Sequence, residues 1–132
     1  MDIQYRQDII PATDQIIDLY ISAGLNRPVS DPERIATMYA HSNLVITAWH
    51  QQELVGISRA LTDFSYCCYL SDLAVSKEYQ ANGIGTKMIE LIRQTIGEQS
   101  TLLLLSAAGA MEYYPKVGFT KIENGFIIKR KY

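Results

Sequence analysis

The chain has 132 residues, a length that suits a single domain. Hydrophobic residues make up 48% and charged residues 20%, the balance of an ordinary globular protein. The formal net charge is −2, and the only basic cluster is the short segment 129–131. This charge balance argues against a nucleic-acid-binding protein, which usually carries a basic surplus or stripe.

The sequence also argues against a secreted protein, a membrane protein and a protein that a structural metal ion stabilises. The first six residues carry charges and no apolar segment, so we expect no signal peptide. No apolar run approaches the length of a membrane span. Cys67 and Cys68 are adjacent, a spacing that suits neither a disulfide framework nor a zinc site. We therefore expect a cytoplasmic protein with reduced thiols, no metal site and no membrane contact.

Periodicity and turn residues predict strands and helices in an alternating order. The first half reads as a strand at 2–6, a helix between Pro11 and Gly24, a helix that begins at Ser30 or Asp31, and strands at 43–50, 53–61 and 66–75. The second half reads as a helix that follows Gly85 and closes at Gly97, a strand at 101–105, a helix at 107–116, and strands at 119–122 and 126–130.

This order of elements predicts a mixed α/β sheet covered by helices. The aliphatic run 101–105 is typical of a strand that is covered on both faces. Asn124 and Gly125 provide a turn between the last two predicted strands. We find no repeat, low-complexity segment or linker that would divide the chain.

The segment Gln80–Thr86, with sequence QANGIGT, is the most informative part of the chain. It lies between a predicted strand and a predicted helix, and its glycines permit close approach of a ligand to the main chain. The unpaired N–H groups and the dipole at a helix start favour a pyrophosphate. The segment is neither a Walker loop nor a dinucleotide fingerprint, and spacing alone equally allows a simple turn.

A family resemblance distinguishes these alternatives. Gln80-x-x-Gly83-x-Gly85 resembles the pyrophosphate loop of the GNAT N-acetyltransferase family, (Arg/Gln)-x-x-Gly-x-(Gly/Ala). The preceding residues, 72–75, are similar to the cofactor-binding strand of that family. Residues 113–119, with sequence YYPKVGF, resemble its second signature, in which Pro115 stands where many members have Glu. The resemblance covers nearly the whole chain.

The resemblance implies a GNAT acyl-CoA N-acyltransferase fold of the α/β (α+β) class in one domain, residues 1–132. The implied sheet is mixed and mostly antiparallel, with six to seven strands and about four helices. The implied activity is transfer of an acetyl group from acetyl-CoA to a primary amine of a small molecule, by direct attack in a ternary complex. The pantetheine arm would lie between residues 73–75 and 104–106, where two strands separate.

The resemblance also implies roles for individual residues. Tyr114 occupies the position of the general acid, with Tyr113 as a competitor. Asp72 is a candidate general base, and equally a structural carboxylate or one that recognises a cationic substrate. The cofactor-binding residues are expected on the strand and the loop: Leu73, Ala74, Val75, Gln80, Ala81, Asn82, Gly83, Ile84, Gly85 and Thr86.

The acceptor is the least determined part of the prediction. Residues 25–31 are expected to border its pocket, with Tyr20, Arg27, Tyr39 and Trp49 as candidate lining side chains and Arg59 as a partner for a carboxylate or a salt bridge. A peptide or protein amine is the nearest alternative acceptor. A non-catalytic acyl-CoA sensor is the alternative from another class. A homodimer would form through the last strands or a sheet edge.

Overall fold

The computed structural model describes residues 1–132 and contains one five-stranded sheet with four α-helices. The strands lie in chain order across the sheet: β1 (Ile3–Arg6), β2 (Leu44–His50), β3 (Glu53–Thr62), β4 (Cys67–Val75) and β5 (Thr101–Leu104). The first four strands are antiparallel, and β5 runs parallel to β4. The helices are α1 (Thr13–Ala23), α2 (Pro32–Ala40), α3 (Ile84–Ile96) and α4 (Tyr113–Lys116).

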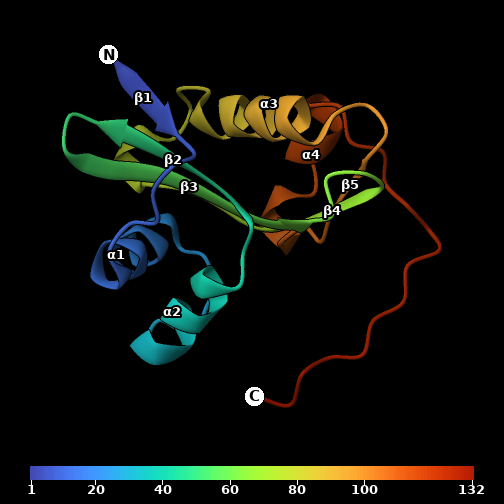
Figure 1. Cartoon of the computed structure of the whole chain (residues 1–132), viewed down its shortest axis with the longest axis horizontal. Coiled ribbons are helices and arrows are strands. Elements are labelled where there is room, and N and C mark those ends of the chain that lie inside the picture. Colours follow the sequence, from blue (N-terminus) through green and yellow to red (C-terminus); the bar gives the residue numbers. More distant parts are fainter.

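The helices cover the two faces of the sheet and create two hydrophobic cores (Figure 1). Helices α1 and α2 cover one face, where their buried side chains pack with Ile57 of β3 and Ala74 of β4. Helix α3 covers the other face. Its buried residues recur at helical spacing, which explains why this segment folds as a helix against the sheet: Ile84, Met88, Ile89, Ile92 and Ile96.

A β-bulge in β4 determines on which face of the sheet the side chains after it lie. The register between β3 and β4 skips Ser71, which has no partner in β3. Because side chains alternate along a strand, one extra residue reverses the faces of those that follow. Leu70 packs in the core beneath α3, whereas Ala74 packs beneath α1 and α2. The bulge therefore turns Asp72 toward α1.

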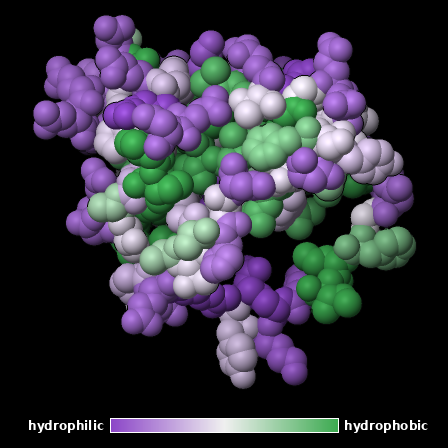
Figure 2. Space-filling model, viewed as in Figure 1, coloured by the Kyte–Doolittle hydropathy of each residue, from purple (hydrophilic) through white to green (hydrophobic).

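The two strands predicted at 119–122 and 126–130 are wrong, so the sheet has five strands rather than six or seven. Residues 119–132 instead form no strand: Phe119 packs against Tyr114, and the residues after 122 run as an extended tail that leaves the sheet (Figures 1 and 2). The end of this tail returns toward α2, where the Tyr132 main-chain oxygen accepts a hydrogen bond from Arg34. Phe126 and Ile128 are 100% and 99% exposed. Aromatic and β-branched residues suit a strand, but a strand also needs a neighbour whose backbone groups complete its hydrogen bonds.

Two smaller predictions also need correction. Strand β5 is not covered on both faces, since Leu103 is 41% exposed, and Leu105, directly after the strand, is 62% exposed. The single helix predicted at 107–116 is divided into a short 3₁₀ turn, Ala108–Ala110, and α4. Cys67 is exposed and Cys68 is buried, as expected for neighbours in a strand. None of the helices combines the length and hydropathy needed to cross a membrane.

Candidate active site

A cleft opens where β4 and β5 separate. The parallel ladder runs from Cys67 and Thr101 to Leu70 and Leu104, and it stops there. Strand β4 continues to Val75 with no partner on this edge. The cleft, of about 1250 Å³, is lined by both strands, by the loop before α3 and by α4. The gap expected between residues 73–75 and 104–106 is therefore present.

The loop before α3 has the left-handed backbone that a concave ring of N–H groups requires. Ala81 and Gly83 have φ angles of 67° and 76°. The Gln80 side chain donates to the carbonyl of Val75 at 3.0 Å, which ties the loop to the end of β4. Asn82 instead turns back and donates to main-chain oxygens of the loop. Nine of the ten predicted cofactor residues line the cleft, all except Asn82.

Gly85 keeps the start of α3 open toward the cleft. A Cβ atom at this position would lie 3.3 Å from the Tyr113 hydroxyl and 3.8 Å from Val75 Cγ2. The Tyr113 hydroxyl is itself hydrogen-bonded to Thr86 Oγ1 at 2.9 Å. The missing side chain therefore leaves a space between β4 and α3 in which a ligand can approach the main chain. This space is what a pyrophosphate site at the helix start needs.

Tyr113 and Tyr114 both line the cleft but are placed differently. Tyr113 is held by Thr86 of α3. The Tyr114 ring packs edge to face against Tyr113 and against Phe119. Its hydroxyl makes no hydrogen bond within the protein and is not fully buried. Burial, and to a lesser degree Tyr113, raises the pKa of Tyr114, so its phenol is protonated at neutral pH.

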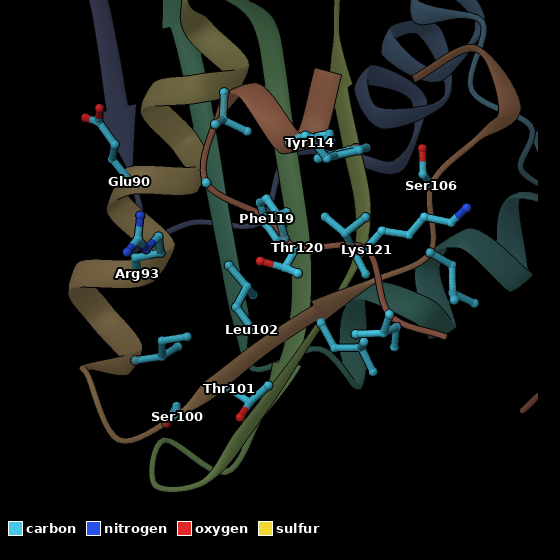
Figure 3. Close-up of a pocket in the computed structure, with 18 of the residues that line it drawn as sticks. Glu90, Arg93, Ser100, Thr101, Leu102, Ser106, Tyr114, Phe119, Thr120 and Lys121 are labelled. Carbon is cyan, nitrogen blue, oxygen red and sulfur yellow. The ribbon is translucent and has the colours of Figure 1, made fainter. Parts of the chain in front are cut away.

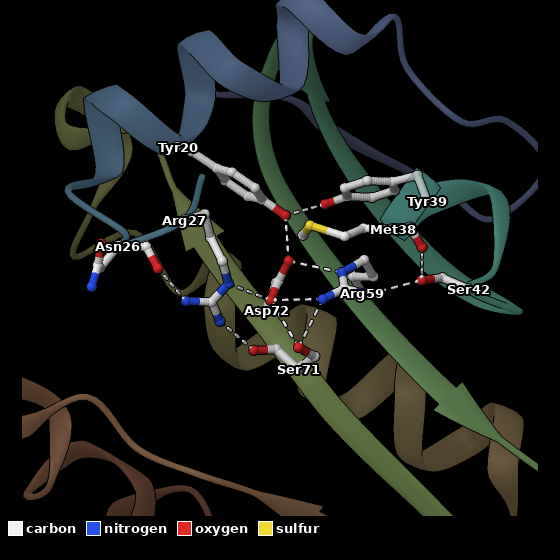
Figure 4. A network of polar contacts seen from close by, with 9 residues as sticks. All are labelled: Tyr20, Asn26, Arg27, Met38, Tyr39, Ser42, Arg59, Ser71 and Asp72. Atoms are coloured by element: carbon white, nitrogen blue, oxygen red, sulfur yellow. Dashed lines mark hydrogen bonds and ion pairs between the residues drawn. The ribbon is translucent and has the colours of Figure 1, made fainter. Parts of the chain in front are cut away.

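Asp72 lies at the centre of a polar network beside the cleft (Figure 4). Its carboxylate accepts hydrogen bonds at 2.8 Å from Nε of Arg59 and at 2.8 Å from Nε of Arg27. It also accepts from the Tyr20 hydroxyl at 2.5 Å and from the Ser71 hydroxyl at 3.0 Å. Both carboxylate oxygens thus have partners, and Asp72 is only 1% exposed.

The sequence and the fold that form this cleft are similar to those of known proteins. The profile of the family described as "Acetyltransferase (GNAT) domain" matches residues 19–129. The chain belongs to the GNAT acetyltransferase family. An uncharacterised N-acetyltransferase of Porphyra purpurea is 26% identical to this GNAT domain over 101 residues. That match covers 70% of this chain and 57% of the relative, so the chain spans little more than half of the algal protein.

Solved structures with GNAT folds superpose on nearly the whole chain. A probable acetyltransferase of unknown function from meticillin-resistant Staphylococcus aureus is 25% identical, with a TM-score of 0.83 over 98% of this chain and 100% of that one. An aminoglycoside acetyltransferase from an uncultured soil sample, solved with sisomicin, is 20% identical. Its TM-score is 0.72 over 99% of this chain and 95% of that one, a likeness of fold alone.

The polar network of this GNAT domain contains two cationic side chains, Arg27 and Arg59, and one carboxylate, Asp72. Burial alone would raise the pKa of Asp72, but hydrogen bonds from Arg59 and Tyr20 and the nearby arginine charges hold that pKa below its ordinary value. Asp72 is therefore ionised at neutral pH, and one carboxylate stands between two guanidinium groups. Burial also raises the pKa of both Tyr20 and Tyr39, whose hydroxyls are hydrogen-bonded, so both phenols are neutral.

The predicted acceptor residues divide into buried and accessible groups. Tyr20 and Tyr39 lie in the core beneath α1 and α2, and the Trp49 indole donates to Thr47. Arg27 and Arg59 line the cleft, and Arg59 forms the predicted salt bridge. Sequence reasoning missed several other lining residues, because they belong to no motif; among them are Ser71, Arg34, Lys129 and Arg130.

A second groove lies on the other side of β5 (Figure 3). It is formed by α3, β5 and the segment 117–122, with Arg93, Leu102 and Lys121 among its lining residues. Of the residues predicted to bind the cofactor or to act in catalysis, only Tyr114 reaches this groove. The cleft between β4 and β5 is therefore the better candidate for the active site of this GNAT domain.

Proposed function

We propose that this protein transfers the acetyl group of acetyl-CoA to a primary amine of a small molecule, in a ternary complex. The observation that carries the proposal is the separation of β4 and β5 beyond Leu70 and Leu104, next to the glycine loop. Members of the GNAT family use acetyl-CoA as the acyl donor. The cleft is bordered by residues 24–28 on one side and by tail residues 127–130 on the other, which favours a small acceptor.

The cleft offers separate surfaces for the two ends of the donor. Residues 73–75 of β4 have main-chain groups on an edge without a partner strand, which can pair with the pantetheine amides. The N–H groups at the start of α3, with Gly83 and Gly85, would hold the pyrophosphate. Holding the donor and the acceptor together in the correct orientation can supply up to about 7–11 kcal/mol of the barrier reduction, and fixing the donor is the first part of this effect.

The reaction that this site supports is a direct displacement. When bound, acetyl-CoA supplies a thioester carbonyl that a neutral amine can attack. A main-chain N–H near Leu73 or Ala74 would stabilise the negative charge that develops on the carbonyl oxygen. A C–N bond forms, the C–S bond breaks, and Tyr114 gives its phenolic proton to the leaving sulfur. The amine loses one proton to water, and the Tyr114 phenolate takes a proton back from water, so that the protons balance.

Asp72 acts in this proposal as a positioning residue rather than as the general base. Its two carboxylate oxygens are occupied by partners, and its pKa is lowered, which makes it a weak base. It holds Arg27 and Arg59 at the edge of the cleft. Their positive charges disfavour an ammonium form of the acceptor, so the amine can lose its proton to water without a dedicated carboxylate.

The test of the activity is thiol release from acetyl-CoA with a panel of amines, with calorimetric CoA binding on the same sample. Release with one class of small amine supports the proposal. Release only with peptides or proteins would replace the small acceptor by a macromolecular one. Tight CoA binding without release across the panel would instead favour a sensor module, and an absence of CoA binding would contradict the cofactor assignment.

Replacement of Tyr114 by phenylalanine should lower kcat by about a hundredfold or more, because general acid catalysis contributes that much. The Kd for CoA should stay within about twofold, since the Tyr114 hydroxyl has no partner in the protein. Tyr113→Phe is the matched control: it removes the bond to Thr86 and should weaken CoA binding more than it lowers kcat. The opposite pattern would make Tyr113 the acid.

A further inference from the structure

The side chains that line the cleft carry a net positive charge. Five of them are cationic: Arg27, Arg34, Arg59, Lys129 and Arg130. None of the lining side chains is a carboxylate. Asp72 lies behind the lining, 1% exposed, and offsets one of these charges. A cleft wall of this kind repels a polycationic acceptor and attracts an anionic one.

Arg27 is the cation that the structure best prepares for a ligand. Its guanidinium has five N–H groups. The structure uses three of them, from Nε to Asp72, from one terminal nitrogen to the carbonyl of Asn26, and from the other to the carbonyl of Ser71. One N–H remains on each terminal nitrogen, and the side chain is 24% exposed. A held, partly open guanidinium of this kind suits a carboxylate.

The position of Arg27 along β4 separates it from the pyrophosphate loop. Arg27 contacts Ser71, directly after the last residue that pairs with β5. The loop before α3 begins beyond Val75, four residues farther along the strand, which is roughly 13 Å at the usual rise of a strand. Arg27 therefore lies at the end of the cleft where the two strands part, away from the donor phosphates.

We propose that Arg27 binds the anionic group of the acceptor, so that the preferred acceptor is an amine that also carries a carboxylate. This inference rests on the proposed acetyl transfer and names its substrate class. Asp72 and the Ser71 carbonyl fix the guanidinium, and Arg34 adds positive charge nearby, although one of its nitrogens donates to the main-chain oxygen of Tyr132. The same charges favour the neutral, reactive form of the bound amine.

The test compares kcat/KM for L-amino acids with that for the corresponding amino acid amides, which keep the amine and lose the negative charge. We expect the wild type to prefer the acids by about tenfold or more, as for charge-assisted hydrogen bonds. Arg27→Gln should reduce this preference to within about threefold, mainly through KM, and Arg27→Lys should retain part of it. Aminoalkyl phosphates in the same panel distinguish a phosphate from a carboxylate preference.

Arg93→Gln is the matched control, because Arg93 lines only the second groove. It should keep the wild-type preference for acids. Equal kcat/KM for acids and amides, or a preference that survives in Arg27→Gln, would overturn the inference while leaving acetyl transfer intact. Loss of CoA affinity in Arg27→Gln with an unchanged acid preference would assign Arg27 to the donor instead.

A binding measurement keeps the two proposals separable. With CoA-saturated protein, N-acetyl amino acids should bind more tightly by calorimetry than their amides, and Arg27→Gln should abolish the difference. If no amine is acetylated but this difference is seen, the proposed activity fails and the anion site stands. If acids and amides bind equally, the anion site is wrong, whatever the turnover. Thermal unfolding of each variant shows whether its fold is retained.

Discussion

Replacement of Gly85 by aspartate should abolish CoA binding. A Cβ atom at this position already lies 3.3 Å from the Tyr113 hydroxyl, so any side chain must enter the space between α3 and β4. A carboxylate there would stand close to the expected pyrophosphate. Two like charges about 4 Å apart repel by about 4 kcal/mol near a protein surface, which is nearly a thousandfold in affinity. Calorimetry with CoA measures the loss.

Two further variants separate the cause of this loss. Gly125→Asp adds the same charge to the tail, outside both the cleft and the second groove, and should bind CoA normally. Gly85→Ala adds only the Cβ atom and should weaken binding less than Gly85→Asp, since the Tyr113 hydroxyl must give way by a few tenths of an ångström. Unchanged affinity in Gly85→Asp would mean that the pyrophosphate lies elsewhere.

The parts of the fold that the sequence predicted well are those with local signals. Helix α3 and the loop before it were predicted because apolar spacing, Gly83, Gly85 and Gly97 all act within a few residues. The strands β1 to β4 followed from short β-branched and aromatic runs between turns. The GNAT family resemblance then predicted the gap between β4 and β5, which is present.

The tail shows what local patterns cannot decide. Residues 126–130 begin with an aromatic and two β-branched side chains, which suit a strand, and Asn124 and Gly125 suit a hairpin turn. Nothing in that pattern states whether a neighbouring edge is within reach of the segment. In the structure no strand pairs with it, and Phe126 and Ile128 are left exposed. Strand formation depends on contacts between distant segments, which propensity does not encode.

The role of Asp72 was left open by the sequence for a related reason. Its partners Tyr20, Arg27 and Arg59 lie 52, 45 and 13 residues away. Asp72 reaches them only because the extra residue Ser71 turns it toward α1. A bulge has no marker in a single sequence, so the choice between a catalytic base and a structural carboxylate required the structure.

Replacement of Asp72 by asparagine should lower the free energy of unfolding by about 3–5 kcal/mol, as when one partner of a buried ion pair is removed. Arg59 and Arg27 would lose their negatively charged partner, while the asparagine side chain would still fill the same space. Urea denaturation at neutral pH measures the loss. Asp18→Asn, at an exposed position of α1, should be nearly neutral. The double variant with Arg59→Gln should recover part of the loss, because the uncompensated charge is gone.

The pH dependence of this effect distinguishes positioning from base catalysis. A carboxyl whose folded pKa is lowered contributes stability fully above its unfolded pKa, and that stability is lost as the pH falls toward the folded value. The pKa of Asp72 is lowered from 3.8, so the difference between wild type and Asp72→Asn should be constant above about pH 5 and shrink below about pH 4. A positioning role predicts that the folded variant keeps the wild-type pH–rate profile at a reduced rate, because water takes the proton from the amine. If the acidic limb of the profile disappears in Asp72→Asn, the carboxylate is the base. The role of Arg27 and Arg59 would then be to set the pKa of Asp72.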